Sequence, residues 1–284
     1  MFSPAKINLY LHITGKRPDG YHLLDSLMVF TDLSDVINIK ESAKTTLEIT
    51  GEFAEKISSG ADNIILKAYN LLKKQTKIKK SDIAIQLEKN IPVGAGMGGG
   101  SGNAAGILSL LNNFWEMNLS IIQLQKLGLK LGADVPFCLG KKAAFVSGIG
   151  ENLDYIDFVG NIHAVLVNPG KGLSTKDVFN SGNIEHSGVV KKPAKFTSKE
   201  NLIDFLIDKK NDLEKSAIKL MPEIADILVL IRQQQGCLIS RMSGSGATCF
   251  GLFYDAQSAL NAEEKIRENN SDWWVRKTEL RFSL

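Results

Sequence analysis

The chain has 284 residues, of which 44% are hydrophobic and 23% are charged, and its formal net charge is +3. These values are typical of a globular protein with a sizeable core and one large or two ordinary domains. So small a net charge gives no reason to expect nucleic acid or an anionic membrane as a partner.

The N-terminal half alternates predicted strands and helices. A half-buried strand is predicted near the N-terminus, because every second residue is apolar: Ile7, Leu9, Leu11 and Ile13. Lys6 lies on the polar side of this strand. Further strands are predicted at 30–39, 46–49 and 83–87. Helices are predicted after an N-cap at Asp62, over 103–117, and from a capping box of Ser120 and Gln123 to Gly132. The lysine-rich residues 73–80 are predicted to be a solvated helix end and loop.

The C-terminal half shows the same two kinds of element in mixed order. Strands are predicted at 143–146, 164–167, 238–242, 249–254 and 273–280. Helices are predicted at 199–213, at 222–235, and from a cap at Asp255 to about residue 269, with an exposed loop at 191–199. The mixed order indicates an α+β chain of two lobes, divided into residues 1–155 and 156–284.

The cysteines argue against a disulfide framework and against a metal site. Cys138, Cys237 and Cys249 are far apart, and the sequence has no CxxC pair or His/Cys cluster. An odd number of cysteines fits a reducing compartment. The N-terminus has no uninterrupted apolar run of the signal-peptide type, and no stretch has the roughly 20 apolar residues of a membrane helix. We therefore expect a cytoplasmic protein without membrane contact.

The most informative stretch is PVGAGMGGGSGNAA, from Pro92 to Ala105, which has six glycines in nine residues. A strand, a glycine loop and a helix form an anion-binding arrangement, because backbone N–H groups and the helix N-terminus point at one spot. A P-loop is excluded, since Gly100 stands where its lysine is required. A dinucleotide fingerprint matches at GxGxxG but lacks the second strand with its acidic residue. A tight turn without ligand remains an alternative.

The glycine stretch closely resembles the second signature of the GHMP kinases, the family named for galactokinase, homoserine, mevalonate and phosphomevalonate kinases. SPAKINLYLHITGKRPDGYHLLDSL, near the N-terminus, resembles the first signature, and SRMSGSGATCFGLF, near the C-terminus, resembles the third. Three matches in the expected order are far more specific than one. The resemblance implies an N-lobe like ribosomal protein S5 domain 2 and a ferredoxin-like C-lobe.

Four segments, AKINLYL, RPDGYHLLDSL, LGADVPFCL and GIGE, narrow the resemblance to one subfamily. The subfamily transfers the γ-phosphoryl group of ATP to the 2-hydroxyl of a cytidylyl methylerythritol. The resemblance therefore implies ATP and Mg²⁺ as cofactors and this small molecule as substrate. A monomer or homodimer that binds no nucleic acid is expected.

The resemblance also assigns residues to the nucleotide. The backbone of the glycine stretch is expected to hold the triphosphate, with the dipole of a helix starting near Asn103. Ser101 adds a hydroxyl donor or approaches Mg²⁺, while Gly102 stands where many relatives have a second serine. Asn63 resembles a position near the adenine, or is only part of a first helical turn. The phosphate-binding residues are Pro92, Val93, Gly94, Ala95, Gly96, Met97, Gly98, Gly99, Gly100, Ser101 and Gly102.

Two charged residues are implied to be catalytic. Asp134, in GADVPF, is the expected base, and Lys6 is expected beside it and the reacting hydroxyl. A nearby cation keeps the carboxylate ionised and makes it a weaker base, so we expect a late proton transfer. The implied substrate contacts are Asn8, Tyr21, His22, Thr175, Phe179, Gly244 and Gly246, with Tyr21, His22 and Phe179 around the cytosine.

Three other functions are compatible with parts of the pattern. The chain can be another GHMP kinase, although the GYH segment argues against it. A nucleotide-binding sensor is a second reading, but such proteins tend to lose catalytic side chains, and Lys6 and Asp134 are present. RNA binding is opposed by the modest charge and the lack of an aromatic-basic stripe. The remaining histidines, His12, His163 and His186, are interpreted as structural.

Overall fold

The computed structural model describes residues 1–75, 82–158, 160–182 and 184–284. These residues group into two compact units, each built from three segments. Unit 1 contains Met1–Ala5, Leu33–Val93 and Gly98–Lys141, and unit 2 contains Lys6–Asp32, Gly94–Met97 and Lys142–Leu284. The predicted division at residue 155 stays a prediction for the two domains. No helix in the described ranges is long and apolar enough to cross a membrane.

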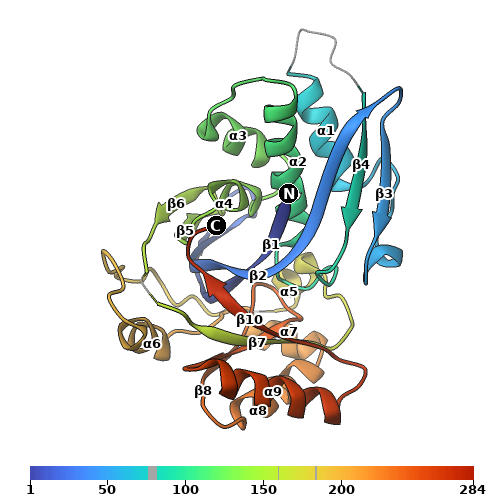
Figure 1. The fold of residues 1–284 in the computed structure, drawn as a ribbon. Coiled ribbons are helices and arrows are strands. Elements are labelled where there is room, and N and C mark those ends of the chain that lie inside the picture. The colour runs from blue at the N-terminus through green and yellow to red at the C-terminus, as the bar shows by residue number, and fades with distance from the viewer. Residues whose placement is uncertain (76–81, 159, 183) are drawn as a thin grey trace. The chain divides into compact units, whose positions relative to one another are not determined.

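Strands and helices are interspersed along the whole chain, as an α+β fold requires (Figure 1). The strands are β1 (Phe2–Lys16), β2 (His22–Ser42), β3 (Thr46–Thr50), β4 (Asp82–Glu88), β5 (Ala144–Gly148), β6 (Asn152–Tyr155), β7 (His163–Asn168), β8 (Cys237–Met242), β9 (Cys249–Phe253) and β10 (Trp274–Arg281). The helices are η1 (Ala54–Lys56), α1 (Ile64–Lys73), α2 (Gly99–Phe114), α3 (Ile121–Gly128), α4 (Val135–Gly140), α5 (Thr175–Asn180), α6 (Lys199–Ile207), α7 (Glu214–Leu220), α8 (Glu223–Arg232) and α9 (Ala256–Asn269).

Unit 1 pairs three strands and packs helices beside them. β3 runs parallel to β4, and β4 runs antiparallel to residues 36–42 of β2. The alternating Ile83, Ile85 and Leu87 of β4 are all buried, which confirms the predicted period of two. Buried Ile65 and Leu72 of α1 and buried Leu108 of α2 supply apolar side chains to the same unit.

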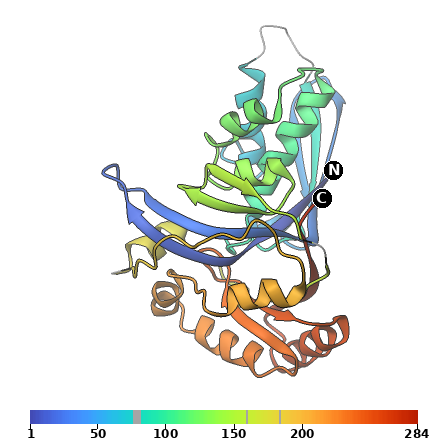
Figure 2. The ribbon, with the colours of Figure 1, turned by 90° about the vertical axis from the view of Figure 1, so that its left-hand side faces the viewer.

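Unit 2 contains an antiparallel sheet with the order β10, β7, β9 and β8. α8 and α9 lie on the same side of this sheet in both views (Figures 1 and 2). Buried Val165 and Val167 of β7 join one core with Ile227 of α8 and Ala262 of α9. The N-terminal part of β2 pairs with β1 and β5, and its residues Phe30 and Thr31 pair with the end of β10.

The prediction that β1 is half-buried was wrong. Residues 6–12 are all buried, including the polar members Lys6, Asn8 and His12. A strand covered on both faces satisfies polar side chains only by hydrogen bonding them to other protein groups. This strand therefore carries a buried polar network.

Three predicted helix limits needed correction. Asn63, not Asp62, is the N-cap of α1, because its side chain accepts a hydrogen bond from Ile65 N. The third helix ends at Gly128 instead of Gly132. The helix predicted over 199–213 ends at Ile207, and the separate helix α7 follows.

Several short elements were not predicted from the sequence, whereas two predicted helix caps are confirmed. The helices α4, α5 and α7 and the strand β6 were not predicted, since four to seven residues show too little periodicity. Both hydrogen bonds of the Ser120 capping box are present, and Asp255 caps α9 through Ser258 N. The loop predicted to be exposed at 191–199 is only partly so: four of its nine residues are exposed, four are partly buried, and Phe196 is buried. Within the lysine run, residues 76–80 lie outside the described residues.

Candidate active site

The first glycine loop, defined as residues 94–102, contributes to both units. Gly94–Met97 belongs to unit 2, while the segment from Gly98 belongs to unit 1. α2 begins at Gly99, with Gly98 as a left-handed N-cap at a φ of 65°. The predicted start near Asn103 was wrong, because Gly99, Gly100 and Gly102 form the first turn of the helix instead of a preceding loop.

The backbone of this loop directs its carbonyl groups into the protein. In unit 2, Gly94 O accepts from Leu173 N at 3.2 Å and Ala95 O accepts from Thr248 N at 3.2 Å. Gly96 O accepts from Ser243 Oγ at 3.1 Å, and Met97 O accepts from Lys6 N at 2.9 Å. By contrast, the N–H groups from Gly94 to Ser101 donate to no other group among the described residues. A run of unpaired N–H groups that ends at a helix N-terminus is an anion-binding arrangement.

Close backbone approach explains the glycine at position 96. Gly96 has a φ of +74°, and a Cβ there would lie 2.3 Å from Ser243 O. Gly244 has a φ of +58°, and its Cβ would lie 2.9 Å from Gly96 O. The first glycine loop and the second glycine loop, defined as residues 243–247, therefore touch backbone to backbone in unit 2. Only residues without a side chain permit this approach.

Ser101 and Asp134 lie in unit 1 on neighbouring turns. A Cβ on Gly132 would lie 3.8 Å from Ser101 Oγ, so the hydroxyl at the start of α2 lies close to the turn that precedes α4. Asp134 occupies the N-cap position of α4, is half-buried, and does not use its carboxylate as a cap. Gly102 faces Ser3, since a Cβ there would lie 2.8 Å from Ser3 Oγ. A second serine at this position would need Ser3 to move.

Lys6 and Asn8 form a buried polar pair on β1 in unit 2. Lys6 Nζ donates to Asn8 Oδ1 at 2.7 Å, and Asn8 Nδ2 donates to Ser26 Oγ at 2.8 Å. The exposed fractions of Lys6 and Asn8 are 4% and 1%, which excludes the solvated edge lysine that strands usually carry. Asn8 N donates to Ser243 Oγ at 3.2 Å, so this strand also holds the second glycine loop.

Thr175 and Phe179 lie four residues apart on α5 and so project from one side of the helix. Thr175 Oγ1 and Ser245 Oγ are hydrogen bonded at 2.8 Å. The rings of Phe179 and His22 pack with their centroids 4.9 Å apart. α5 therefore connects the second glycine loop with the GYH segment within unit 2.

The predicted aromatic site has two partners in contact and one exposed. A base held between His22 and Phe179 would need about 7 Å between the rings, at about 3.5 Å for each contact. Their separation leaves no room for it, while Tyr21 has an exposed fraction of 60%. The His22 side chain is partly buried, and this burial is the largest cause of its lowered pKa. The charges of Lys16 and His186 lower the pKa further. The lowered pKa favours the neutral imidazole, which keeps one acceptor nitrogen.

Asn63 has a structural use in unit 1. Its Oδ1 accepts from Ile65 N at 2.9 Å, and its Nδ2 donates to Ser58 O at 2.6 Å. These bonds favour the helix-start reading, although they leave one amide hydrogen for another partner. Pro92 is buried and Val93 is 36% exposed, where β4 has ended and the first glycine loop has not yet begun.

Sequence reasoning missed a buried ion pair beneath α2 in unit 1. Lys89 Nζ lies 2.5 Å from Asp35 Oδ2, and their side chains are 3% and 0% exposed. Asp35 Oδ1 also accepts from Asn90 N at 2.7 Å and Ile91 N at 2.9 Å. A Cβ on Gly99 would lie 3.2 Å from Lys89 Nζ. The pair thus supports the turn where α2 starts. No local pattern signals it, because the two residues are 54 positions apart.

The described residues contain no group of three His, Cys, Asp or Glu side chains that could hold a metal ion. Mg²⁺ does not need such a group, because it is usually bound through one or two carboxylates together with substrate phosphates. Ser101, in the first turn of α2, and Asp134, in the turn before α4, carry oxygen atoms of the required kind. The residues of unit 1 therefore fit a phosphate-bound Mg²⁺.

Comparison with known proteins identifies the family. The model of the GHMP kinase N-terminal domain matches residues 63–142, and that of the GHMP kinase C-terminal domain matches residues 198–272. The chain belongs to the GHMP kinase family.

Relatives within the family share one name. A 4-diphosphocytidyl-2-C-methyl-D-erythritol kinase of Chelativorans sp. (strain BNC1) is 42% identical over 284 residues, which cover 99% of this chain and 96% of the relative. The protein of the same name from Paracoccus denitrificans (strain Pd 1222) is 43% identical over 274 residues, or 96% of this chain and 93% of the relative.

Solved structures agree with this grouping. The crystal structure of a 4-(cytidine 5'-diphospho)-2C-methyl-D-erythritol kinase matches 99% of this chain and 98% of its own, with a TM-score of 0.78 and 29% identity. A homoserine kinase from Cytophaga hutchinsonii ATCC 33406 matches 99% of this chain and 94% of its own, with a TM-score of 0.71 and 16% identity, and shares the fold. The predicted α+β, two-lobe GHMP kinase fold is confirmed.

Proposed function

We propose that this chain transfers the γ-phosphoryl group of ATP to the 2-hydroxyl of 4-diphosphocytidyl-2-C-methyl-D-erythritol. Two kinds of observation support the proposal. Relatives with this name are about 40% identical over nearly the whole chain. The first glycine loop presents unpaired N–H groups from Gly94 to Ser101, as a polyphosphate requires.

The N–H run is the observation that carries the nucleotide part of the proposal. Phosphoryl transfer asks the protein mainly to position the reactants and to stabilise charge on the phosphate oxygens. Four consecutive carbonyl groups, from Gly94 to Met97, already accept hydrogen bonds from unit 2. The N–H groups therefore need no rearrangement before they meet an anion. In this proposal they bind the β- and γ-phosphates, and the dipole of α2 adds partial positive charge.

In the proposed reaction, the substrate hydroxyl oxygen forms a bond to the γ-phosphorus while the bond from that phosphorus to the β,γ-bridging oxygen breaks. ADP leaves with the electron pair. Asp134 orients the hydroxyl and accepts its proton late in the step, and Lys6 stabilises the negative charge that develops on the oxygen. The hydrogen bond from Lys6 to Asn8 supports this role, because it fixes the direction of the ammonium group.

Mg²⁺, when bound with ATP, would supply positive charge that neutralises the phosphate oxygens. Ser101 would help to hold it, beside the turn of unit 1 that carries Asp134. Thr175 is then a polar contact for the acceptor substrate, and Gly244 and Gly246 let that substrate or the phosphates approach the backbone. The first domain would comprise residues 1–155 and the second residues 156–284, a division supported by family matches on either side of it.

The cytosine would lie against the exposed face of Tyr21. The contact between His22 and Phe179 supports a site in which these two rings lie side by side at the edge of the base. In the arrangement we propose, the base stacks on Tyr21 and the neutral His22 hydrogen bonds to its polar edge. The edge of Phe179 closes the site.

The experiment follows ADP release from ATP and Mg²⁺ with three acceptors: 4-diphosphocytidyl-2-C-methyl-D-erythritol, homoserine and mevalonate. Turnover with the first alone is expected. Asp134→Asn should lose about 100-fold in kcat, the scale of a positioned acid–base group. Asp154→Asn, an exposed carboxylate on β6, is the matched control and should retain wild-type kcat. Turnover of homoserine or mevalonate instead would assign another GHMP activity. Nucleotide binding without turnover of any acceptor would favour a sensor.

A further inference from the structure

Asn211, between α6 and α7, makes a pair of hydrogen bonds that sequence reasoning did not anticipate. Its Nδ2 donates to Met242 O and to Gly244 O, each at 2.8 Å. The residue is 4% exposed, and its Oδ1 accepts from Leu213 N at 3.0 Å. All of its polar side-chain hydrogens therefore serve the second glycine loop and the strand before it.

The backbone on either side of Asn211 is joined to β1. Leu11 N donates to Lys210 O at 3.1 Å, and Asp212 N donates to Leu11 O at 2.8 Å. β1 is the strand that carries Lys6 and Asn8. Asn211 thus links that strand directly to the second glycine loop, in addition to the bond from Asn8 N to Ser243 Oγ.

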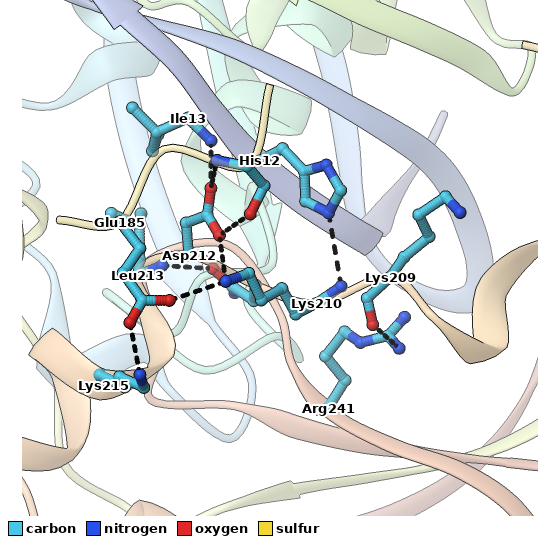
Figure 3. Close-up of polar contacts among 11 residues, drawn as sticks. His12, Ile13, Glu185, Lys209, Lys210, Asp212, Leu213, Lys215 and Arg241 are labelled. Atoms are coloured by element: carbon cyan, nitrogen blue, oxygen red, sulfur yellow. Dashed lines mark hydrogen bonds and ion pairs between the residues drawn. The ribbon is translucent and has the colours of Figure 1, made fainter. Parts of the chain in front are cut away.

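Neighbouring charged side chains hold this segment rigidly (Figure 3). The Asp212 carboxylate is fully buried and accepts from Ile13 N at 2.7 Å and from Ser187 Oγ at 2.6 Å. Arg241 donates to the carbonyl groups of Leu9, Leu206 and Lys209. Because these bonds fix the backbone around Asn211, its amide acts from a defined position.

Fixing a carbonyl also fixes the N–H of the same peptide plane. In a trans peptide the C=O of residue 244 and the N–H of residue 245 point in opposite directions. Asn211 therefore directs Ser245 N–H away from itself. Gly244 and Ser245 are buried, and their N–H groups donate to no other group among the residues described. Backbone donors without a protein partner are rare in buried segments, so these N–H groups are available to a ligand or a bound water.

We propose that Asn211 is a positioning residue for phosphoryl transfer. Through the Gly244 carbonyl it sets the direction of the Ser245 N–H group relative to Lys6 and Asn8, so that this group meets the anionic reactants in the reactive geometry. The inference rests on the proposed function, and it adds a residue to which neither the sequence nor the family resemblance assigned a role.

The test measures kcat and KM for both substrates in Asn211→Asp, which has nearly the same shape but replaces the donating amide with an acceptor oxygen. Three acceptor oxygens would then meet, and the second glycine loop must move away. A displacement of about 1 Å costs on the order of 100-fold in rate. We expect kcat to fall between about 10- and 100-fold, while KM for ATP changes less than about threefold.

Ser187→Ala is the matched control, because it removes a hydrogen bond to Asp212 without touching the second glycine loop. It should keep kcat within about threefold of wild type. Melting temperatures are recorded for each variant, and Asn211→Ser, which keeps an acceptor for Leu213 N, replaces Asn211→Asp if the latter does not fold.

The outcomes separate the two proposals. An inactive wild type would mean that the proposed function has failed. An active wild type with kcat unchanged in the folded Asn211 variant, or reduced equally in Ser187→Ala, would overturn the positioning role. A fall in kcat confined to the Asn211 variant supports that role.

Discussion

Gly96→Ala places a single methyl group where the two glycine loops meet. The new Cβ would lie 2.3 Å from Ser243 O and 2.9 Å from Gly246 O. Carbon and oxygen atoms normally approach to about 3.3 Å, so the backbone must shift by about 1 Å. The shift stretches the bonds that Gly96 O and Ala95 O accept from Ser243 Oγ and Thr248 N.

The magnitude follows from three contributions. A left-handed conformation costs alanine about 1–2 kcal/mol, and each weakened hydrogen bond costs about 1 kcal/mol. Gly96→Ala should therefore lower the free energy of unfolding by about 3–4 kcal/mol. A 1 Å displacement of the phosphate-binding N–H groups should lower kcat/KM for ATP on the order of 100-fold.

Gly188→Ala is the control that separates backbone strain from the steric collision expected in Gly96→Ala. Gly188 has a φ of +77°, close to the +74° of Gly96, but nothing lies within 4 Å of the position that a Cβ would take there. It should show the strain of about 1–2 kcal/mol alone and nearly normal kinetics. Urea unfolding and an ADP-release assay measure both variants. If Gly96→Ala keeps kcat/KM for ATP within threefold of wild type, the close contact between the loops does not position the phosphates.

Three further predictions concern other parts of the molecule. Lys89→Met leaves the buried Asp35 carboxylate without its cation and should lower the free energy of unfolding, measured with urea, by about 3–5 kcal/mol. The double variant with Asp35→Asn should recover part of this stability. A loss below about 1 kcal/mol in Lys89→Met would contradict the prediction. Burial lowers the pKa of His12 from its ordinary value of 6.5, although the charges of Asp212 and Asp25 oppose this shift. Because the unfolded chain then binds more protons than the folded one, stability should fall as the pH drops from about 7.5 to about 5.5. His12→Gln should reduce that fall in melting temperature, and an unchanged slope would exclude His12 as its source. Tyr21→Ala should raise KM for the cytidylyl substrate about tenfold without changing KM for ATP, whereas equal changes in both would contradict a base-stacking role.

Sequence patterns predicted those helices and strands whose structure depends only on residues close together in the chain. The alternation at Ile83, Ile85 and Leu87, the capping box at Ser120 and the cap at Asp255 depend only on neighbouring residues, and all are present. Three ordered motifs predicted the family, because each combines several residue types at fixed spacing.

Features that depend on distant residues could not be read in this way. The polar face of β1 is covered by chain more than 200 positions away, as in the bond from Asn8 N to Ser243 Oγ. The Asn211 bonds to Met242 O and Gly244 O join residues more than 30 positions apart. The start of α2 was misjudged for another reason, since glycine propensity argues against the helix that begins at Gly99. Low propensity at a helix N-terminus is itself a sign of a ligand site, where backbone N–H groups are needed.

The central claim is that the chain phosphorylates the 2-hydroxyl of 4-diphosphocytidyl-2-C-methyl-D-erythritol. The most direct measurement is the ³¹P NMR spectrum of this substrate after incubation with the purified protein, ATP and Mg²⁺. The account predicts a new phosphomonoester resonance without three-bond coupling to a proton, as expected for the tertiary 2-carbon, in an amount equal to the ADP formed. ADP without a new phosphomonoester, or a phosphate on another hydroxyl, would contradict it.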